Sequence, residues 1–264
     1  DESISIHSVE RYVGDYILEH ADQFYRAPKK ETGYKVALVG AGPAGLSAAY
    51  YLRKAGHDVT VVDKMEKAGG MLTYAIPNYR LPQGYVEKIV AAYEKMGIKF
   101  RLSYTVGEDA SAEKFEQGYD KVFYATGAWK RPVLGFDGEE FTEFGLQFLI
   151  EVNQWMNKKD RDHVLVVGGG NVAMDAARCA KRLGAENVYI VYRRSEEEMP
   201  ARKEEIHHAK EEGIQFLLLN NPVRINNDGS GAVKSMECIK MELGEPDASG
   251  RRRPIEIKGS EFEL

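Results

Sequence analysis

Two glycine-rich segments, residues 40–45 (GAGPAG) and 168–173 (GGGNVA), have the composition and spacing of a dinucleotide-binding loop. In such a loop the first glycine permits a tight turn and the second lets the backbone approach a pyrophosphate. The third position, Gly or Ala, lets a helix pack on a strand. The N-terminus of that helix then offers free N–H groups and a positive dipole end to the anion. One such match is weak evidence, because glycine clusters also occur in ordinary turns, so the flanking elements decide.

The elements around the first loop predict a complete βαβ unit. Residues 35–39 form a short apolar run typical of a buried parallel strand, and residues 44–55 are rich in Ala and Leu, as in a helix. Residues 58–62 predict a second strand. Asp63 follows it, at the position where an acidic side chain accepts hydrogen bonds from a ribose hydroxyl.

The second loop repeats this order with a different charge at the end. A strand over 164–167, a helix over 172–183 and a strand over 188–191 are predicted, and Arg193 and Arg194 follow. Guanidinium groups suit a 2′-phosphate in charge and in bidentate geometry, which favours NADPH over NADH. The alternative is that both arginines are merely solvated at a strand end.

Composition narrows the class of protein. The chain has 264 residues, 43% of them hydrophobic, which suffices for two compact cores. A net charge of −5 gives no basis for nucleic-acid binding, and no apolar run approaches the roughly 20 residues of a membrane span. No secretory signal is recognised at the start, and the two cysteines, Cys179 and Cys238, are expected to be packing residues of a reduced, cytoplasmic protein.

Further elements are expected outside the two loops. An amphipathic helix is predicted from Ser8, as its cap, to about Tyr25, followed by a polar linker at 27–33. The remaining expectations are a helix over 85–96, strands over 98–102 and 119–124, a helix ending over 150–157, a strand over 214–219, and a hairpin at 226–229.

Six motifs in order together carry a family resemblance. They are residues 40–45, 69–72 (GGML), 76–82 (IPNYRLP), 125–127 (ATG), 168–173, and 192–201 (YRRSEEEMPA). From about Ile4 onward the chain resembles the glutamate synthase small (β) subunit family, which includes the flavin half of dihydropyrimidine dehydrogenase. The resemblance implies an α/β fold with two Rossmann-like βαβ nucleotide-binding domains, preceded by an N-terminal helix. The expected divisions are a helical segment and linker at 1–33, an FAD-binding domain at 34–140 and an NADPH-binding domain at 141–264.

The resemblance also implies which residues bind FAD. The expected contacts are Gly40, Gly42, Pro43, Ala44, Gly45, Asp63, Lys64, Gly70, Met71, Leu72, Arg80, Val106, Ala125, Thr126 and Gly127. The glycine loop would hold the pyrophosphate, and Val106 would lie near adenine. The family usually has Glu where this chain has Asp63, and the shorter side chain still reaches a ribose.

The expected NADPH contacts follow from the second loop. They are Gly168, Gly170, Asn171, Val172, Ala173, Arg193, Arg194 and Arg202. Arg202 lies in a charged segment, residues 196–205, which a solvated helix explains equally well. No side-chain acid or base is needed for hydride transfer between bound cofactors, so no catalytic residue is assigned. His207 and His208 lack metal-ligand spacing, and residues 251–253 are expected to be a solvated hairpin rather than a phosphate site.

These features predict a flavin-dependent oxidoreductase module. NADPH would reduce FAD, and the electrons would pass to a partner domain or subunit, such as an iron–sulfur protein or a glutamate synthase large subunit. Family members also have a cysteine-rich N-terminal region and a later Gly-Asp segment that returns to the flavin, so the chain is expected to be a fragment of a longer protein. The alternatives are a nucleotide-binding fragment without turnover, or an FAD-only protein whose second loop is structural.

Overall fold

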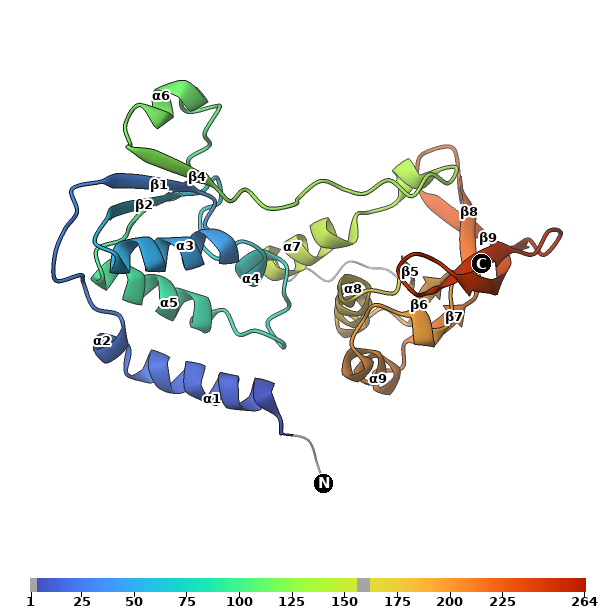
Figure 1. The fold of residues 1–264 in the computed structure, drawn as a ribbon. Helices are drawn as coiled ribbons and strands as arrows, with labels where there is room; N and C mark the ends of the chain where they lie inside the picture. The colour runs from blue at the N-terminus through green and yellow to red at the C-terminus, as the bar shows by residue number, and fades with distance from the viewer. Residues whose placement is uncertain (1–3, 156–161) are drawn as a thin grey trace. The chain divides into compact units, whose positions relative to one another are not determined.

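A computed structural model describes residues 4–155 and 162–264 of the chain. The chain divides into two compact units, Asp1–Trp129 and Lys130–Leu264. Each unit contains one of the two glycine loops (Figure 1).

The first unit is built on a four-stranded parallel sheet. Its strands are β1 (Lys35–Val39), β2 (Asp58–Val62), β3 (Lys99–Arg101) and β4 (Lys121–Tyr124), in the order β3-β2-β1-β4. The register runs from Lys35 opposite Asp58 to Val39 opposite Val62. The central strands are apolar because the sheet is covered on both faces.

Helices cover the two faces of this sheet unequally. Helices α3 (Pro43–Lys54) and α5 (Gly84–Lys95) lie along one face, and the short α6 (Ala112–Glu116) lies on the other (Figure 1). On the first face Leu38 and Val59 pack with Leu46 of α3, and on the second Ala37 and Val62 pack with Phe115 of α6. A one-turn helix, α4 (Met71–Tyr74), follows the glycine pair at 69–70.

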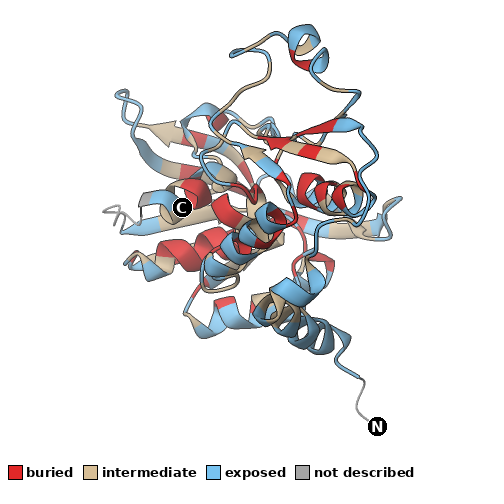
Figure 2. Cartoon of the chain, turned by 90° about the vertical axis from the view of Figure 1, so that its left-hand side faces the viewer, coloured by how far each residue is buried: buried red, intermediate tan, exposed pale blue. Residues whose placement is uncertain are grey.

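The N-terminal segment differs from the single helix predicted over 8–25. Helix α1 (Ile6–Glu19) begins earlier, with Ser5 and not Ser8 at the cap position, and a separate turn, α2 (Ala21–Phe24), follows after His20. No residue of α1 is buried, as Figure 2 shows beside the N-terminus. Arg11 joins α1 to α5 through a 2.6 Å hydrogen bond from its guanidinium to the Tyr85 hydroxyl.

The second unit contains a three-stranded parallel sheet, β5 (His163–Val167), β6 (Asn187–Tyr192) and β7 (Gln215–Leu218), in that order. Helix α8 (Asn171–Arg182) connects β5 to β6, and α9 (Lys203–Glu211) precedes β7. Helix α7 (Gly145–Trp155) precedes β5, and the last two residues of the helix predicted to end at 157 lie outside the described residues. Within the described residues, β5 pairs only with β6 and forms one edge of this sheet.

An antiparallel sheet follows the parallel one. Its strands are β8 (Asn220–Asn227), β9 (Val233–Pro246), β10 (Arg252–Glu256) and the short β11 (Phe262–Glu263), with β9 pairing with each of the other three. The predicted hairpin at 226–229 is therefore present as the β8–β9 turn. Ile225, Met236 and Cys238 of this sheet pack with Val191 of β6, so the two sheets share a core.

Two short 3₁₀ helices lie in the loops of the second unit, η1 (Glu139–Phe141) and η2 (Glu196–Glu198). Glu139 is buried and accepts hydrogen bonds from the N–H groups of Leu134 and Gly135. These two bonds hold the pKa of Glu139 below its usual value. Asp137 forms a β-bridge to Arg224, so the segment that precedes η1 belongs structurally to the second unit.

Candidate functional site

The first glycine loop lies at the point in the sheet where the strand order reverses. From β1 the chain passes through α3 to β2 on one side, and later returns to β4 on the other side. The carboxyl ends of β1 and β4 are thus neighbours, and the loops that follow them, residues 40–45 and 125–127, lie at one edge. In open α/β sheets ligands bind at such a switch point.

Backbone contacts show why this site requires glycine. A Cβ atom on Gly40, whose φ is +116°, would lie 2.2 Å from the carbonyl oxygen of Ala125. A Cβ on Gly45 would lie 1.8 Å from the carbonyl oxygen of Gly40, and one on Gly70 would lie 2.8 Å from Cα of Gly42. The structure therefore brings residues 40–45, Gly70 and Ala125 together.

The N-terminus of α3 in this loop has the features of an anion site. Gly42 is the cap residue, Pro43 begins the helix, and no side chain accepts a hydrogen bond from the first turn. The first-turn N–H groups of a helix have no partner within the helix, and their dipoles favour negative charge. Because no Cβ projects from Gly42 into the approach, the residues fit a pyrophosphate.

Asp63, which was predicted to bind a ribose hydroxyl, also has a structural role. Its Oδ2 accepts a 2.7 Å hydrogen bond from the N–H of Ala41, and its Oδ1 accepts a 2.8 Å bond from the N–H of Met65. The carboxylate thus ties the glycine loop to the end of β2. A carboxylate can accept about four hydrogen bonds, so a ribose hydroxyl can still be received.

The other residues predicted to contact FAD differ in exposure and in the elements that contain them. Met71 and Leu72 are in α4, directly after Gly70, and are half-buried, as is Arg80 in the following turn. Lys64 places its ammonium 5.5 Å from the ring centroid of Trp129, and the Thr126 carbonyl accepts from the Trp129 indole. Val106 packs on the α6 side of the sheet, against the cluster that contains Phe115.

The second glycine loop has the same construction. Gly168, with φ +141°, donates from its N–H to the carbonyl oxygen of Val191 at 3.0 Å. A Cβ on Gly169 would lie 2.7 Å from the Tyr192 ring, and Gly170 caps α8 without a side-chain hydrogen bond. Ala173 is buried against the sheet while Val172 is exposed. The helix N-terminus is again open to an anion.

Two hydrogen bonds join this loop to the segment after β6, and a third joins the last residue of β6 to the same segment. The N–H of Ala201 donates to the Gly169 carbonyl at 3.1 Å, and the N–H of Arg202 donates to Oδ1 of Asn171 at 3.1 Å. The Tyr192 hydroxyl donates to the carbonyl of Glu198 at 2.9 Å. The glycine loop and residues 192–202 therefore form one hydrogen-bonded unit.

The three arginines predicted for the 2′-phosphate are placed differently. Arg193 and Arg202 are exposed, the latter as the cap residue of α9. Arg194 is buried, with 8% of its side chain exposed, and forms a 2.7 Å ion pair with Asp247. Its Nε also donates to the Arg252 carbonyl at 2.8 Å.

Sequence reasoning missed the residues that hold Arg194 and its loop. Asp247 and Arg252 flank the turn between β9 and β10. Arg252 is half-buried, not simply solvated as predicted for residues 251–253. Ser195 and Glu198 form a capping box, and its S-x-x-E spacing was a signal available in the sequence. The charged segment 196–205 is not one helix, because η2 ends before α9 begins.

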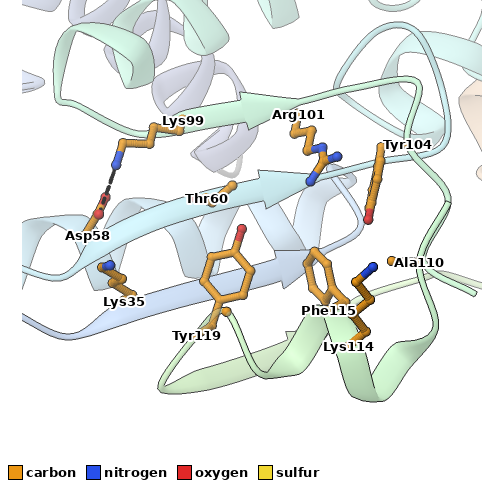
Figure 3. A pocket seen from close by; sticks show the side chains of 11 residues that line it. Lys35, Asp58, Thr60, Lys99, Arg101, Tyr104, Ala110, Lys114, Phe115 and Tyr119 are labelled. Carbon is orange, nitrogen blue, oxygen red and sulfur yellow. Dashed lines mark hydrogen bonds and ion pairs between the residues drawn. The ribbon is translucent and has the colours of Figure 1, made fainter.

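In the first unit, a basic hollow of about 420 Å³ lies on the face of the sheet that α6 covers (Figure 3). Four cations line it: Lys35, Lys99, Arg101 and Lys114. The Lys99 ammonium pairs with Asp58 at 2.8 Å, and the Arg101 guanidinium stacks over Tyr104, 3.5 Å from the ring centroid. None of the residues predicted to bind a nucleotide lines this hollow, so it is separate from the glycine loop.

Among the described residues, no group of three or more His, Cys, Asp or Glu is arranged to hold a metal ion. His207 and His208 lie on α9, where His207 pairs with Glu211 at 3.2 Å. Within the same ranges, no helix is both long enough and apolar enough to cross a membrane.

The fold and the two loops define a protein class with two dinucleotide-binding α/β units. Residues 34–248 match the family model described as pyridine nucleotide-disulphide oxidoreductase. The chain belongs to this family, and the predicted α/β fold class is confirmed.

Curated relatives confirm the predicted resemblance. The chain is 36% identical to the glutamate synthase [NADPH] small chain of Escherichia coli, over 98% of the chain and 58% of the relative. It is 39% identical to the NADP(+)-dependent formate dehydrogenase subunit beta of Moorella thermoacetica and 40% identical to the NADPH-Fe(3+) oxidoreductase subunit beta of Geobacter sulfurreducens. The chain covers 41% and 40% of these two proteins, so it spans well under two thirds of its relatives.

The fold is similar to that of a solved oxidoreductase. FprA from Mycobacterium tuberculosis, in complex with NADPH, matches with a TM-score of 0.74 at 20% identity. The match covers 88% of this chain and 68% of that one. At this identity the likeness establishes the fold alone.

Proposed function

We propose that the chain is the nucleotide-binding part of an NADPH-dependent FAD oxidoreductase that passes electrons to a partner subunit or domain. The observation that carries this proposal is the duplicated site. Each parallel sheet has a glycine loop leading into a helix N-terminus that no side chain caps. Names of the relatives support it, since the three compared above are each an NADP(H)-linked subunit or small chain.

In the proposal the first loop holds FAD and the second holds NADPH, each within the compact unit that contains it. Bound FAD would supply the redox chemistry by accepting a hydride from NADPH and releasing electrons singly or in pairs. The chain contributes binding and orientation: Gly42, Ala44 and Gly45 at one pyrophosphate, and Gly170 and Asn171 at the other. No side chain needs to move a proton, so no catalytic residue is proposed.

The remaining FAD contacts in the proposal are those that surround the first loop. Asp63 receives a ribose hydroxyl while it holds the Ala41 N–H, and Met71 and Leu72 contact the flavin side. Arg193 recognises the 2′-phosphate of NADPH, because it is the exposed arginine that directly follows β6.

The proposal includes an electron-accepting partner, first as a general class and then as a specific kind of protein. Relatives named as a subunit beta or a small chain support a partner subunit. An iron–sulfur protein or a glutamate synthase large subunit is the finer proposal, in a cytoplasmic setting. Since the chain spans 40–58% of these relatives, a nucleotide-binding fragment without turnover is the competing function.

The visible absorption spectrum of the purified chain, before and after anaerobic addition of NADPH or NADH, tests the proposal. A bound flavin that bleaches faster with NADPH supports the reductase. A colourless chain that takes up no added FAD but binds NADPH supports the fragment without turnover. A chain that binds neither nucleotide overturns both functions.

A further inference from the structure

The β9–β10 hairpin is bonded to the loop that would recognise the NADPH 2′-phosphate. Near the N-terminal side of this loop, the Arg194 guanidinium meets Asp247 Oδ2 at 2.7 Å. Farther along, Arg252 donates from Nε to Glu198 Oε1 at 2.5 Å and from Nη2 to Glu197 at 3.0 Å. Two residues that flank the turn of one hairpin thus bind two points of the loop.

Both acidic partners are themselves fixed. Asp247 Oδ1 accepts from the Ser249 hydroxyl at 2.5 Å and from the Ser249 N–H at 2.8 Å, and these bonds hold the pKa of Asp247 below its usual value. Glu198 is only 6% exposed. Burial opposes its ionisation, but bonds from the Ser195 hydroxyl and Arg252 keep its pKa below the usual value. Both carboxylates therefore remain charged near neutral pH.

The two adjacent arginines are consequently not equivalent. Arg194 donates from Nε to the Arg252 carbonyl and from Nη2 to Asp247, and only 8% of its side chain is exposed. For this guanidinium to reach a phosphate, it would have to leave its buried position and break the ion pair with the half-buried Asp247, which is unfavourable. Arg193 carries no such cost, because it is exposed and forms no ion pair with the described residues.

We infer that Arg194 is a positioning residue and not a phosphate ligand: the Arg194–Asp247 and Arg252–Glu198 pairs clamp the loop so that Arg193 meets the 2′-phosphate. This inference rests on the proposed NADPH site. It assigns a specificity role to the β9–β10 hairpin. It also gives the adjacent Arg193 and Arg194 different roles, which the sequence alone does not distinguish.

The Asp247→Asn substitution separates the two roles of Arg194 by the sign of its effect. It keeps an oxygen for the bonds of the 247–251 turn, and it replaces the Oδ2 that faces Arg194 with a donor. A clamp would be broken, so affinity for a 2′-phosphate would fall. A phosphate ligand would instead be released from its internal partner, so affinity would stay the same or rise.

The measurement is calorimetric binding of 2′,5′-ADP and of 5′-AMP to the whole chain, because these two probes differ at the 2′-phosphate and need no flavin. For Asp247→Asn, Arg194→Gln and the double variant we expect equal losses of 2′,5′-ADP affinity, about tenfold, the worth of roughly one hydrogen bond. Equal single and double losses are the signature of residues that act as one unit. Binding of 5′-AMP should change less than twofold.

Two further variants test the role of Arg193 and provide a control on the hairpin. Arg193→Gln should lower 2′,5′-ADP affinity by roughly 10- to 100-fold, as for a lost charge-assisted contact, and leave 5′-AMP binding unchanged. Because Arg193 is exposed, this variant keeps its fold even if a clamp variant does not. Arg253→Gln, on the same hairpin but exposed, is the matched control and should bind both probes as the unaltered chain does.

The outcomes distinguish the inference from the proposed function. If the unaltered chain binds 2′,5′-ADP and Asp247→Asn binds it as well or better, the clamp is wrong and the NADPH site stands. If Arg193→Gln binds 2′,5′-ADP normally, the assignment of the phosphate to Arg193 is wrong. If the unaltered chain shows no preference for 2′,5′-ADP over 5′-AMP, the NADPH site itself fails, and the clamp with it.

Discussion

Single glycines control the first site through backbone contacts that no other residue permits. Gly45→Ala would place a methyl group 1.8 Å from the Gly40 carbonyl oxygen, so the loop must move. We expect the variant to retain no flavin and to lose roughly 1–3 kcal/mol of stability, as in overpacked sites. Flavin content and thermal unfolding measure both effects.

Gly84→Ala provides the control for this prediction. Gly84 also begins a helix, α5, but a Cβ there meets nothing within 4 Å. This variant should match or exceed the parent stability by up to about 1 kcal/mol, because alanine restricts the unfolded chain. Flavin retention by Gly45→Ala at the level of Gly84→Ala would show that the loop does not bind the cofactor.

The two thiols should resist modification in the folded chain. Burial raises the pKa of Cys179 to about 12 and that of Cys238 to about 11, from an ordinary value of 9.0. Because the folded values are raised, each thiol contributes stability that is fully present below pH 9 and is lost as the pH rises toward 11–12. A chromogenic disulfide reagent at pH 8 should react slowly with the native chain and rapidly in guanidinium chloride. Equal rates in the two conditions would contradict the burial of these thiols.

Residue type made the glycines of both sites predictable, but not the partners of the charged side chains. Gly40, Gly45 and Gly70 could be recognised because motif spacing is a local signal, although Gly40 and Gly70 face Ala125 and Gly42 from distant parts of the chain. Asp63 binds the N–H of Ala41, and Arg194 binds Asp247, 53 residues later on a hairpin. Such pairings depend on the tertiary fold, and single-sequence patterns do not contain them.

At the level of elements, the βαβ pattern predicted most of the parallel strands well. The bounds of β1 and β2 match the prediction, because apolar runs there end at glycine or at charged residues. The N-terminal segment was predicted less well: its helical periodicity continues past His20, where the backbone leaves the helix. A hairpin at 226–229 was predicted, but the 14-residue extent of the following strand β9 was not, since its polar and apolar residues follow long-range pairing with β8 and β10.

Helix α8 is fixed to α9 by Arg178, which bridges Glu205 at 2.8 Å and Glu212 at 2.9 Å. Arg178→Ala leaves these carboxylates without their buried partner, and we expect a loss of about 3–5 kcal/mol. Arg182→Ala is the control: Arg182 binds the same Glu212 but is 46% exposed, so the loss should be about 1 kcal/mol or less. Chemical denaturation compares the two, and similar losses would contradict a structural difference between the pairs.

At the scale of the whole molecule, two compact units with separate ligands predict two unfolding events. Scanning calorimetry of the chain should show that 2′,5′-ADP raises the midpoint of one transition and FAD that of the other. A ligand at 100 times its Kd stabilises the unit that binds it by about 2.7 kcal/mol. A single transition raised by both ligands would mean that the units unfold together.

Strand β5 forms an edge of the parallel sheet in the second unit. It is largely apolar, and within the described residues it has a hydrogen-bonding partner on one side only. A free row of N–H and C=O groups is a template on which another chain can add a strand. Preparations of these 264 residues should therefore be kept at low protein concentration and low temperature. A high protein concentration favours aggregation through this edge.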